Sequence, residues 1–102
     1  MKARLEVRGN GHFAVEGELS FATVPGLWDQ SRRFFANAPK SMNIDLAAVE
    51  RADSAGLALL VAWTRQGRID AKSIHLTNAP GQIMALAEAN KLTHLLPLQA
   101  AG

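Results

Sequence analysis

The chain has 102 residues, 48% of them apolar, with 11 Lys and Arg against 9 Asp and Glu and no cysteine. This arithmetic indicates one domain over residues 1–102 that folds without disulfides, and it excludes thiol catalysis and cysteine-bound zinc. A net charge of +2 without a basic run longer than Arg32-Arg33 argues against nucleic acid as a partner.

Two strands joined by a tight turn are predicted at the start of the chain. Apolar residues alternate with polar ones over about 3–8 and again over about 12–18. Asn10-Gly11 lies between the two runs, and it is a strong hairpin signal because both residues tolerate positive φ.

A helix is predicted from Val24 to about Asn37, because the apolar spacing changes to three and four residues. Phe34 or Phe35 is expected in the core, since one of the pair must lie near the sheet. Trp28, in the first turns, is expected at the surface as a contact residue, because exposed aromatic side chains often anchor interfaces.

The second half of the chain alternates strand and helix. The patterns predict a strand at 42–46, a helix at 54–66 that stops at Gly67, a strand at 73–77, a helix started by Asn78 and Pro80, and an apolar tail at 91–98. The strand–helix–strand segment predicts a right-handed crossover with parallel strands. The fold class is therefore α/β (α+β), with the order β-β-α-β-α-β-α, about four strands in a single sheet and three or four helices.

The segment Asp53-Ser54-Ala55-Gly56-Leu57 carries the most information. Asp53 or Ser54 can accept a hydrogen bond from the free N–H groups of the following helix, and a carboxylate there complements the helix dipole. Gly56 can allow another surface to approach the helix start closely. Capping alone would also explain these residue types.

These residues, together with the strand that ends in Asp45-Leu46 and with the earlier segment 15–19, resemble the signature of the STAS domain family. The resemblance covers about residues 3–98, and it implies the family's mixed sheet with helices. Within the family, the chain is most similar to the MlaB-type members, which are subunits of phospholipid ABC transporters that maintain outer-membrane lipid asymmetry.

The resemblance implies a non-enzymatic accessory subunit whose partner is the ATPase subunit of such a transporter. The expected partner-binding residues are the helix start and one first-helix residue: Trp28, Asp53, Ser54, Ala55, Gly56 and Leu57. Arg51, Arg65 and Arg68 are expected either to form a polar rim around this surface or to be merely solvated.

An alternative is an anti-sigma-factor antagonist that is regulated by serine phosphorylation. In such family members a partner kinase usually modifies the residue immediately before the motif glycine. That residue is Ala55 here, which cannot be phosphorylated, and Ser54 one position earlier is the remaining candidate.

Catalysis, metals and membrane spans have little support in the sequence. Ala52 replaces the first glycine of the Gly-x-Ser-x-Gly nucleophile motif, and His12, His75 and His94 are scattered without ligand spacing. No cofactor is expected. The longest apolar run, Gly56–Trp63, is far shorter than the roughly 20 residues of a membrane span, so we do not expect the chain to span a membrane. Cytoplasmic is the default location, and the resemblance implies that the partner holds the protein at the inner membrane.

Overall fold

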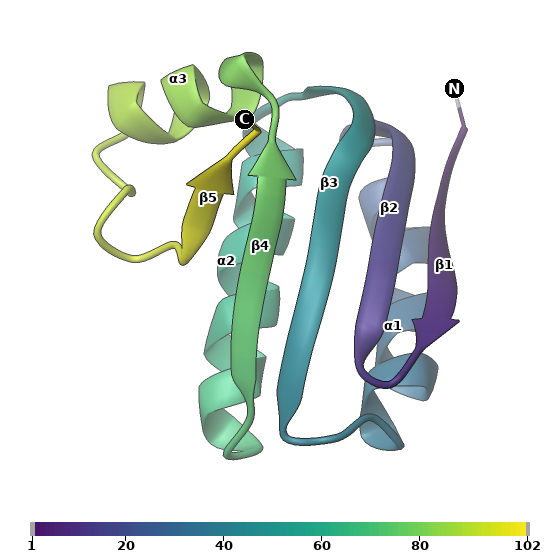
Figure 1. Cartoon of the computed structure of the whole chain (residues 1–102). Helices are drawn as coiled ribbons and strands as arrows, with labels where there is room; N and C mark the ends of the chain where they lie inside the picture. Colours follow the sequence, from purple (N-terminus) through teal and green to yellow (C-terminus); the bar gives the residue numbers. More distant parts are fainter. Residues whose placement is uncertain (1, 102) are drawn as a thin grey trace.

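The computed structural model describes residues 2–101 and contains a five-stranded sheet with three helices (Figure 1). The elements in chain order are β1 (Ala3–Gly9), β2 (His12–Leu19), α1 (Val24–Ala36), β3 (Ser41–Ala52), α2 (Ser54–Ile69), β4 (Ser73–Ala79), α3 (Gly81–Ala89) and β5 (Leu98–Ala100). The predicted order of elements and the mixed α/β fold class are confirmed.

The strands follow one another across the sheet in the order β1-β2-β3-β4-β5. The first pair is antiparallel and every later pair is parallel. The predicted hairpin is confirmed, with φ of 52° at Asn10 and 78° at Gly11. The predicted parallel crossover through α2 is confirmed as well, with Ile44 of β3 opposite Leu76 of β4.

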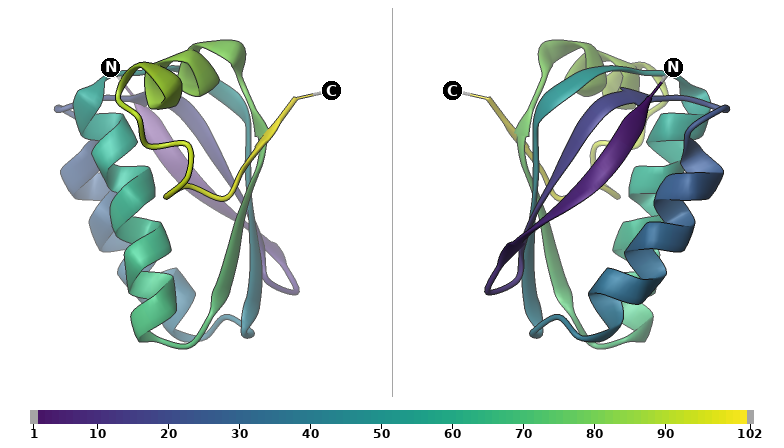
Figure 2. Two further views of the ribbon diagram at one scale, coloured as in Figure 1. Left: turned by 90° about the vertical axis from the view of Figure 1, so that its left-hand side faces the viewer. Right: turned by 90° about the vertical axis from the view of Figure 1, so that its right-hand side faces the viewer.

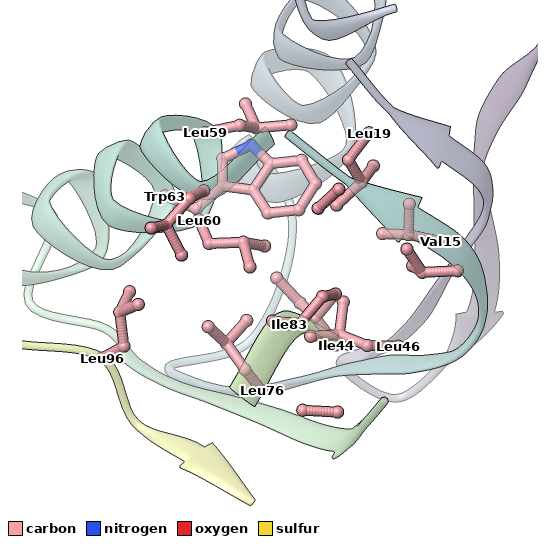
Figure 3. Packing of buried hydrophobic residues seen from close by; sticks show 14 of the residues in the cluster. Val15, Leu19, Ile44, Leu46, Leu59, Leu60, Trp63, Leu76, Ile83 and Leu96 are labelled. Carbon is pink, nitrogen blue, oxygen red and sulfur yellow. The ribbon is translucent and has the colours of Figure 1, made fainter. Parts of the chain in front are cut away.

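The core lies between the sheet and the helices α1 and α2, which cover the same face of the sheet (Figure 2). Alternate side chains of the strands meet apolar side chains of α2 there, among them Leu60 and Trp63 (Figure 3). α3 packs across one end of the sheet and contributes Ile83 and Ala87 to the core. Both long helices are therefore held by burial of one apolar face.

The other face of the sheet is polar. Arg4 pairs with Glu16 at 2.8 Å, and Arg8 bridges Glu6 and Asp45 at 3.4 and 3.0 Å. Burial raises the pKa of Asp45, but hydrogen bonds from the N–H of Ala47 and from the side chains of its neighbours outweigh burial and hold that pKa below its ordinary value of 3.8. These charged side chains therefore pair with one another across the face.

Three features differ from the sequence-based expectation. β3 runs to Ala52 rather than ending near residue 46, and the tail contains a fifth, three-residue strand. α2 continues past Gly67 to Ile69, so the predicted stop at Gly67 is wrong. Gly67 is instead a point of close approach, because a Cβ there would lie 2.6 Å from the side chain of Ile74 on β4.

None of the helices within residues 2–101 has the length and apolar character needed to cross a membrane.

Candidate functional site

Asp53 joins the end of β3, the loop after β2 and the start of α2. Its carboxylate accepts hydrogen bonds from the N–H groups of Gly56 at 3.0 Å and Phe21 at 3.1 Å. Its own N–H donates to the carbonyl of Leu19 at 3.0 Å. The bond from Gly56 is the main cause that lowers the pKa of Asp53 below 3.8. Asp53, and not Ser54, therefore caps α2. The same carboxylate also ties the start of α2 to the loop after β2.

Gly56 and Leu57 are buried within the chain itself. A Cβ at residue 56 would lie 2.3 Å from the carbonyl oxygen of Leu19. The surface that approaches the start of α2 closely is therefore the end of β2 in the same chain. Leu57 is 3% exposed and belongs to the core. The expectation that these two residues offer a contact surface is corrected: they fix the position of α2 against the end of β2.

Ser54 and Ala55 have a different environment from the two residues that follow them. Ser54 is the first residue of α2 and is exposed, and Ala55 is half-buried. Ala55 lines a shallow groove between the first turns of α1 and α2.

The groove has a volume of about 410 Å³ and is lined only by apolar residues. Phe21 forms its rim with 84% of its surface exposed, the largest exposure among the large apolar side chains within residues 2–101. The lining residues, which we call the apolar groove, are Phe21, Val24, Pro25, Trp28, Ala55, Ala58, Leu59 and Ala62.

The loop that presents Phe21 is held by hydrogen bonds. The Thr23 hydroxyl accepts from the N–H of Ser20 at 2.9 Å and donates to the carbonyl of Glu18 at 2.7 Å. Together with the bond from Phe21 N–H to Asp53, these contacts fix the turn between β2 and α1. The exposed ring thus stands on a braced loop.

Trp28 is half-buried on α1, packs against the core and lines the groove, and its role in partner contact stays a prediction. Phe35 packs edge-on against Phe13 and Trp63, with ring centroids 4.9 and 5.7 Å apart, as expected for a core aromatic residue. Phe34 is also partly buried against the core.

The three arginines proposed as a rim do not surround the apolar groove. Arg51 is the penultimate residue of β3, and its positive charge is a minor contribution to the lowered pKa of Asp53. Arg65 and Arg68 lie in the last turns of α2, roughly 15–20 Å along the helix from Ser54. Neither belongs to the lining of the apolar groove.

The exposed part of this site is mainly apolar. Within residues 2–101, no three His, Cys, Asp or Glu side chains gather as a metal site would require. His12 is the first residue of β2, and His75 is the third residue of β4. Ser54, the candidate nucleophile of the motif, follows the end of the parallel strand β3. The two histidines therefore lie at the opposite end of the strands from Ser54. An exposed aromatic ring beside a groove of small apolar side chains is suited to protein binding.

Comparison with known proteins places this architecture in a family. A family model described as "Mlab, STAS domain" matches residues 4–97. The chain belongs to the STAS domain family. STAS domains are in general regulatory or accessory domains without catalytic activity.

Solved structures share the fold of this STAS domain at low sequence identity. The anti-sigma factor antagonist SpoIIAA in its unphosphorylated form is 18% identical, with a TM-score of 0.69 over 99% of this chain and 89% of that chain. The crystal structure of Mglu is 19% identical, with a TM-score of 0.56 over 72% of this chain and 18% of that chain. A search of curated proteins found no match.

Proposed function

We propose that this STAS domain is an accessory subunit that binds the cytoplasmic ATPase of a Mla-type phospholipid ABC transporter, with the apolar groove as the docking surface. The MlaB-type family match supports the class of partner. The observation that carries the choice of surface is the exposure of Phe21 beside a groove with an entirely apolar lining.

Burial of this surface would be favourable. Apolar area removed from water contributes about 25 cal/mol per Å², and buried aromatic residues often dominate the binding energy of an interface. Phe21 and Trp28 supply two aromatic side chains within one small area, while Ala55, Ala58 and Ala62 allow a partner's backbone or side chains to approach α2. Ser54 lies at the edge of this area and can contribute a hydroxyl.

The open face of the sheet is a weaker candidate for the same partner. Its charged side chains already pair with one another through Arg4 and Arg8. A partner there would have to displace these exposed ion pairs and would gain little apolar burial. The helix face is therefore the better docking surface.

The subunit would act by binding rather than by chemistry. A protein that binds one conformation of the ATPase dimer more tightly than another shifts the population toward the favoured conformation. The braced loop around Phe21 suits this role, because a surface that is already ordered loses little conformational freedom on binding.

The test is co-purification with the Mla-type ATPase of the same genome. Phe21→Ser, and separately Trp28→Ala combined with Ser54→Arg, are expected to abolish the complex. Ile69→Ser is the matched control, because Ile69 is 70% exposed at the far end of α2 and is expected to leave the complex intact. A complex that survives Phe21→Ser, or the absence of any complex with the unaltered chain, contradicts the proposal.

A second function, that of an anti-sigma-factor antagonist switched by phosphorylation, is favoured by the SpoIIAA fold match and by the exposure of Ser54. Phosphate at a helix N-terminus gains from the dipole, but the carboxylate of Asp53 next to it opposes a second negative charge. Phosphopeptide mass spectrometry of protein from its native cells separates the two functions. Stoichiometric phosphoserine at residue 54 supports the switch, and its absence under all growth conditions supports the constitutive subunit.

A further inference from the structure

A second cavity lies between α1 and α2, mostly along their C-terminal halves, and shares Trp28 with the apolar groove. Its volume is about 300 Å³, at the lower end of the roughly 300–1,000 Å³ that is usual for ligand pockets. The base of the cavity is formed by side chains of both helices and of β3 and β4, including Phe35, Met42, Trp63 and Ile74.

The apolar wall of the cavity is pre-formed. The ring of Phe35 packs edge-on against Trp63, and the Trp63 indole N–H donates to the Ser31 hydroxyl at 2.9 Å. That hydroxyl donates in turn to the carbonyl of Trp28 at 2.7 Å. The two tryptophans of the chain therefore both line the cavity and are linked through Ser31.

Arg32 supplies a positive charge at the mouth of the cavity. Lys72 is engaged, because its Nζ donates to the carbonyls of Phe35 and Ala38 at the end of α1. Asp70 accepts from the amide of Gln66 at 3.2 and 3.3 Å. Arg32 has no ion pair among the residues that the structure describes, so its guanidinium is the available recognition group.

The surroundings of the cavity add to this positive potential. The segments 32–41 and 65–73, where each long helix ends and the next strand begins, contain six of the 11 basic residues and one acid, a net side-chain charge of +5. The rest of the chain carries a net −3. Such a local excess attracts small anions and raises their concentration near the cavity.

We propose that this cavity binds a small amphipathic anion, a monocarboxylate with an apolar body such as a medium-chain fatty acid. The aromatic wall contacts the apolar body, and the planar guanidinium of Arg32 donates two hydrogen bonds to the carboxylate oxygens. The carboxylate of Asp70 at the same mouth disfavours ligands with a second negative charge. This inference does not depend on the identity of the docking partner.

The test uses octanoate and the intrinsic fluorescence of the purified protein. Because both tryptophans line the cavity, a ligand inside it changes their emission in a saturable way. Octanol is the uncharged control and is expected to bind at least tenfold more weakly, since it lacks the charge-assisted hydrogen bonds to Arg32. The absence of a saturable response to octanoate would overturn the proposal.

Two variants separate the cavity from general attraction by the basic end. Arg32→Gln is expected to weaken octanoate binding about tenfold, and Arg33→Gln, an exposed neighbour outside the cavity lining, is expected to change it less than twofold. Ala36→Leu narrows the cavity from an exposed helix position and is expected to abolish binding. Equal effects of the two arginine variants, or unchanged binding by Ala36→Leu, would contradict the assignment. Trp28 is left unaltered because it lines the apolar groove as well.

Discussion

At Gly56, the absence of a side chain allows α2 to begin directly against the end of β2. A Cβ there would lie 2.3 Å from the carbonyl oxygen of Leu19 and 2.6 Å from its Cβ. We predict that Gly56→Ala lowers the free energy of unfolding by about 1–3 kcal/mol, the usual cost of overpacking. Urea denaturation followed by circular dichroism measures this change.

Gly26 provides the matched control for that substitution. It lies in the first turn of α1, where a Cβ would meet no other atom within 4 Å. Gly26→Ala is therefore expected to be neutral or to stabilise by up to about 1 kcal/mol through helix propensity. Equal losses of stability in the two variants would show that the contact with Leu19 is not the cause.

Asp53 makes the stability of the fold depend on pH. Because its pKa is lower in the folded chain than in the unfolded chain, its contribution is complete above the unfolded value of about 3.8 and is lost as pH falls through the folded value. We predict that Asp53→Asn costs about 1 kcal/mol of unfolding free energy at pH 7, because the amide has one acceptor oxygen for the two N–H groups of Gly56 and Phe21 and lacks the charge that complements the helix dipole. The difference from the unaltered chain is expected to shrink below pH 4 in denaturation curves measured across pH. A difference that is constant over this range would show that the carboxylate charge has no part in the cap.

The two long helices are joined by a buried hydrogen bond as well as by apolar contacts. Trp63 is 1% exposed, and Ser31 accepts its indole N–H. Ser31→Ala leaves this donor buried without a partner, which we predict to cost about 1–3 kcal/mol. In a double-mutant cycle with Trp63→Phe, the double variant is expected to lose about 1 kcal/mol less than the sum of the single losses. Additive losses would mean that the bond contributes nothing to the contact between α1 and α2.

The sequence predicts the existence and order of these elements well because each long helix and inner strand has a clear hydrophobic period. It does not predict the length of β3. Ala47-Ala48 and Glu50-Arg51 are weak strand formers, and they become extended because β2 pairs alongside, with Glu16 opposite Ala48 and Glu18 opposite Arg51. The sequence does not predict β5 either, because three residues are too few to show the alternation of apolar and polar residues that indicates a strand.

The candidate site is predicted only in part for a similar reason. Asp53, Ser54 and Trp28 are visible in the sequence, because capping motifs and helix periodicity are local. Phe21 is missed, since a single aromatic residue in a loop has no periodic signal, and only its place two residues before Thr23, at the helix start, could have indicated it. The burial of Gly56 depends on β2, which lies far away in the chain, and no local pattern reports that contact.

For the whole molecule, the helix layer separates two kinds of surface. The first turns of α1 and α2 form most of the apolar groove, and their later turns form most of the cavity, near an excess of positive charge. Both lie on the same pair of helices and share Trp28, and the opposite face of the sheet carries the paired charges. A protein partner and a small anion bound to the helix layer would therefore both contact Trp28.

Stability is also distributed unevenly over the molecule, and hydrogen exchange can detect this. β3 pairs with β2 from Asn43 to Ala52 and with β4 from Ser41 to Asp45, whereas β5 pairs with β4 only at Leu76–Leu98 and Ala79–Ala100. Local opening of the C-terminal segment would break few hydrogen bonds and would expose little apolar surface to water. We predict that peptides from 90–101 exchange at least tenfold faster than peptides from 42–46 and 57–63.

The start of α2 is the internal control for that measurement. It is held by the Asp53 cap and by the burial of Leu57 and Leu60, so its amides are expected to stay protected while the C-terminal segment opens. Protection that is uniform from residue 42 to residue 101 would mean that β5 and α3 open only with the whole domain. Faster exchange at 54–60 than at 90–101 would mean that the docking surface is not ordered in advance, and the low entropy cost assigned to partner binding would then be lost.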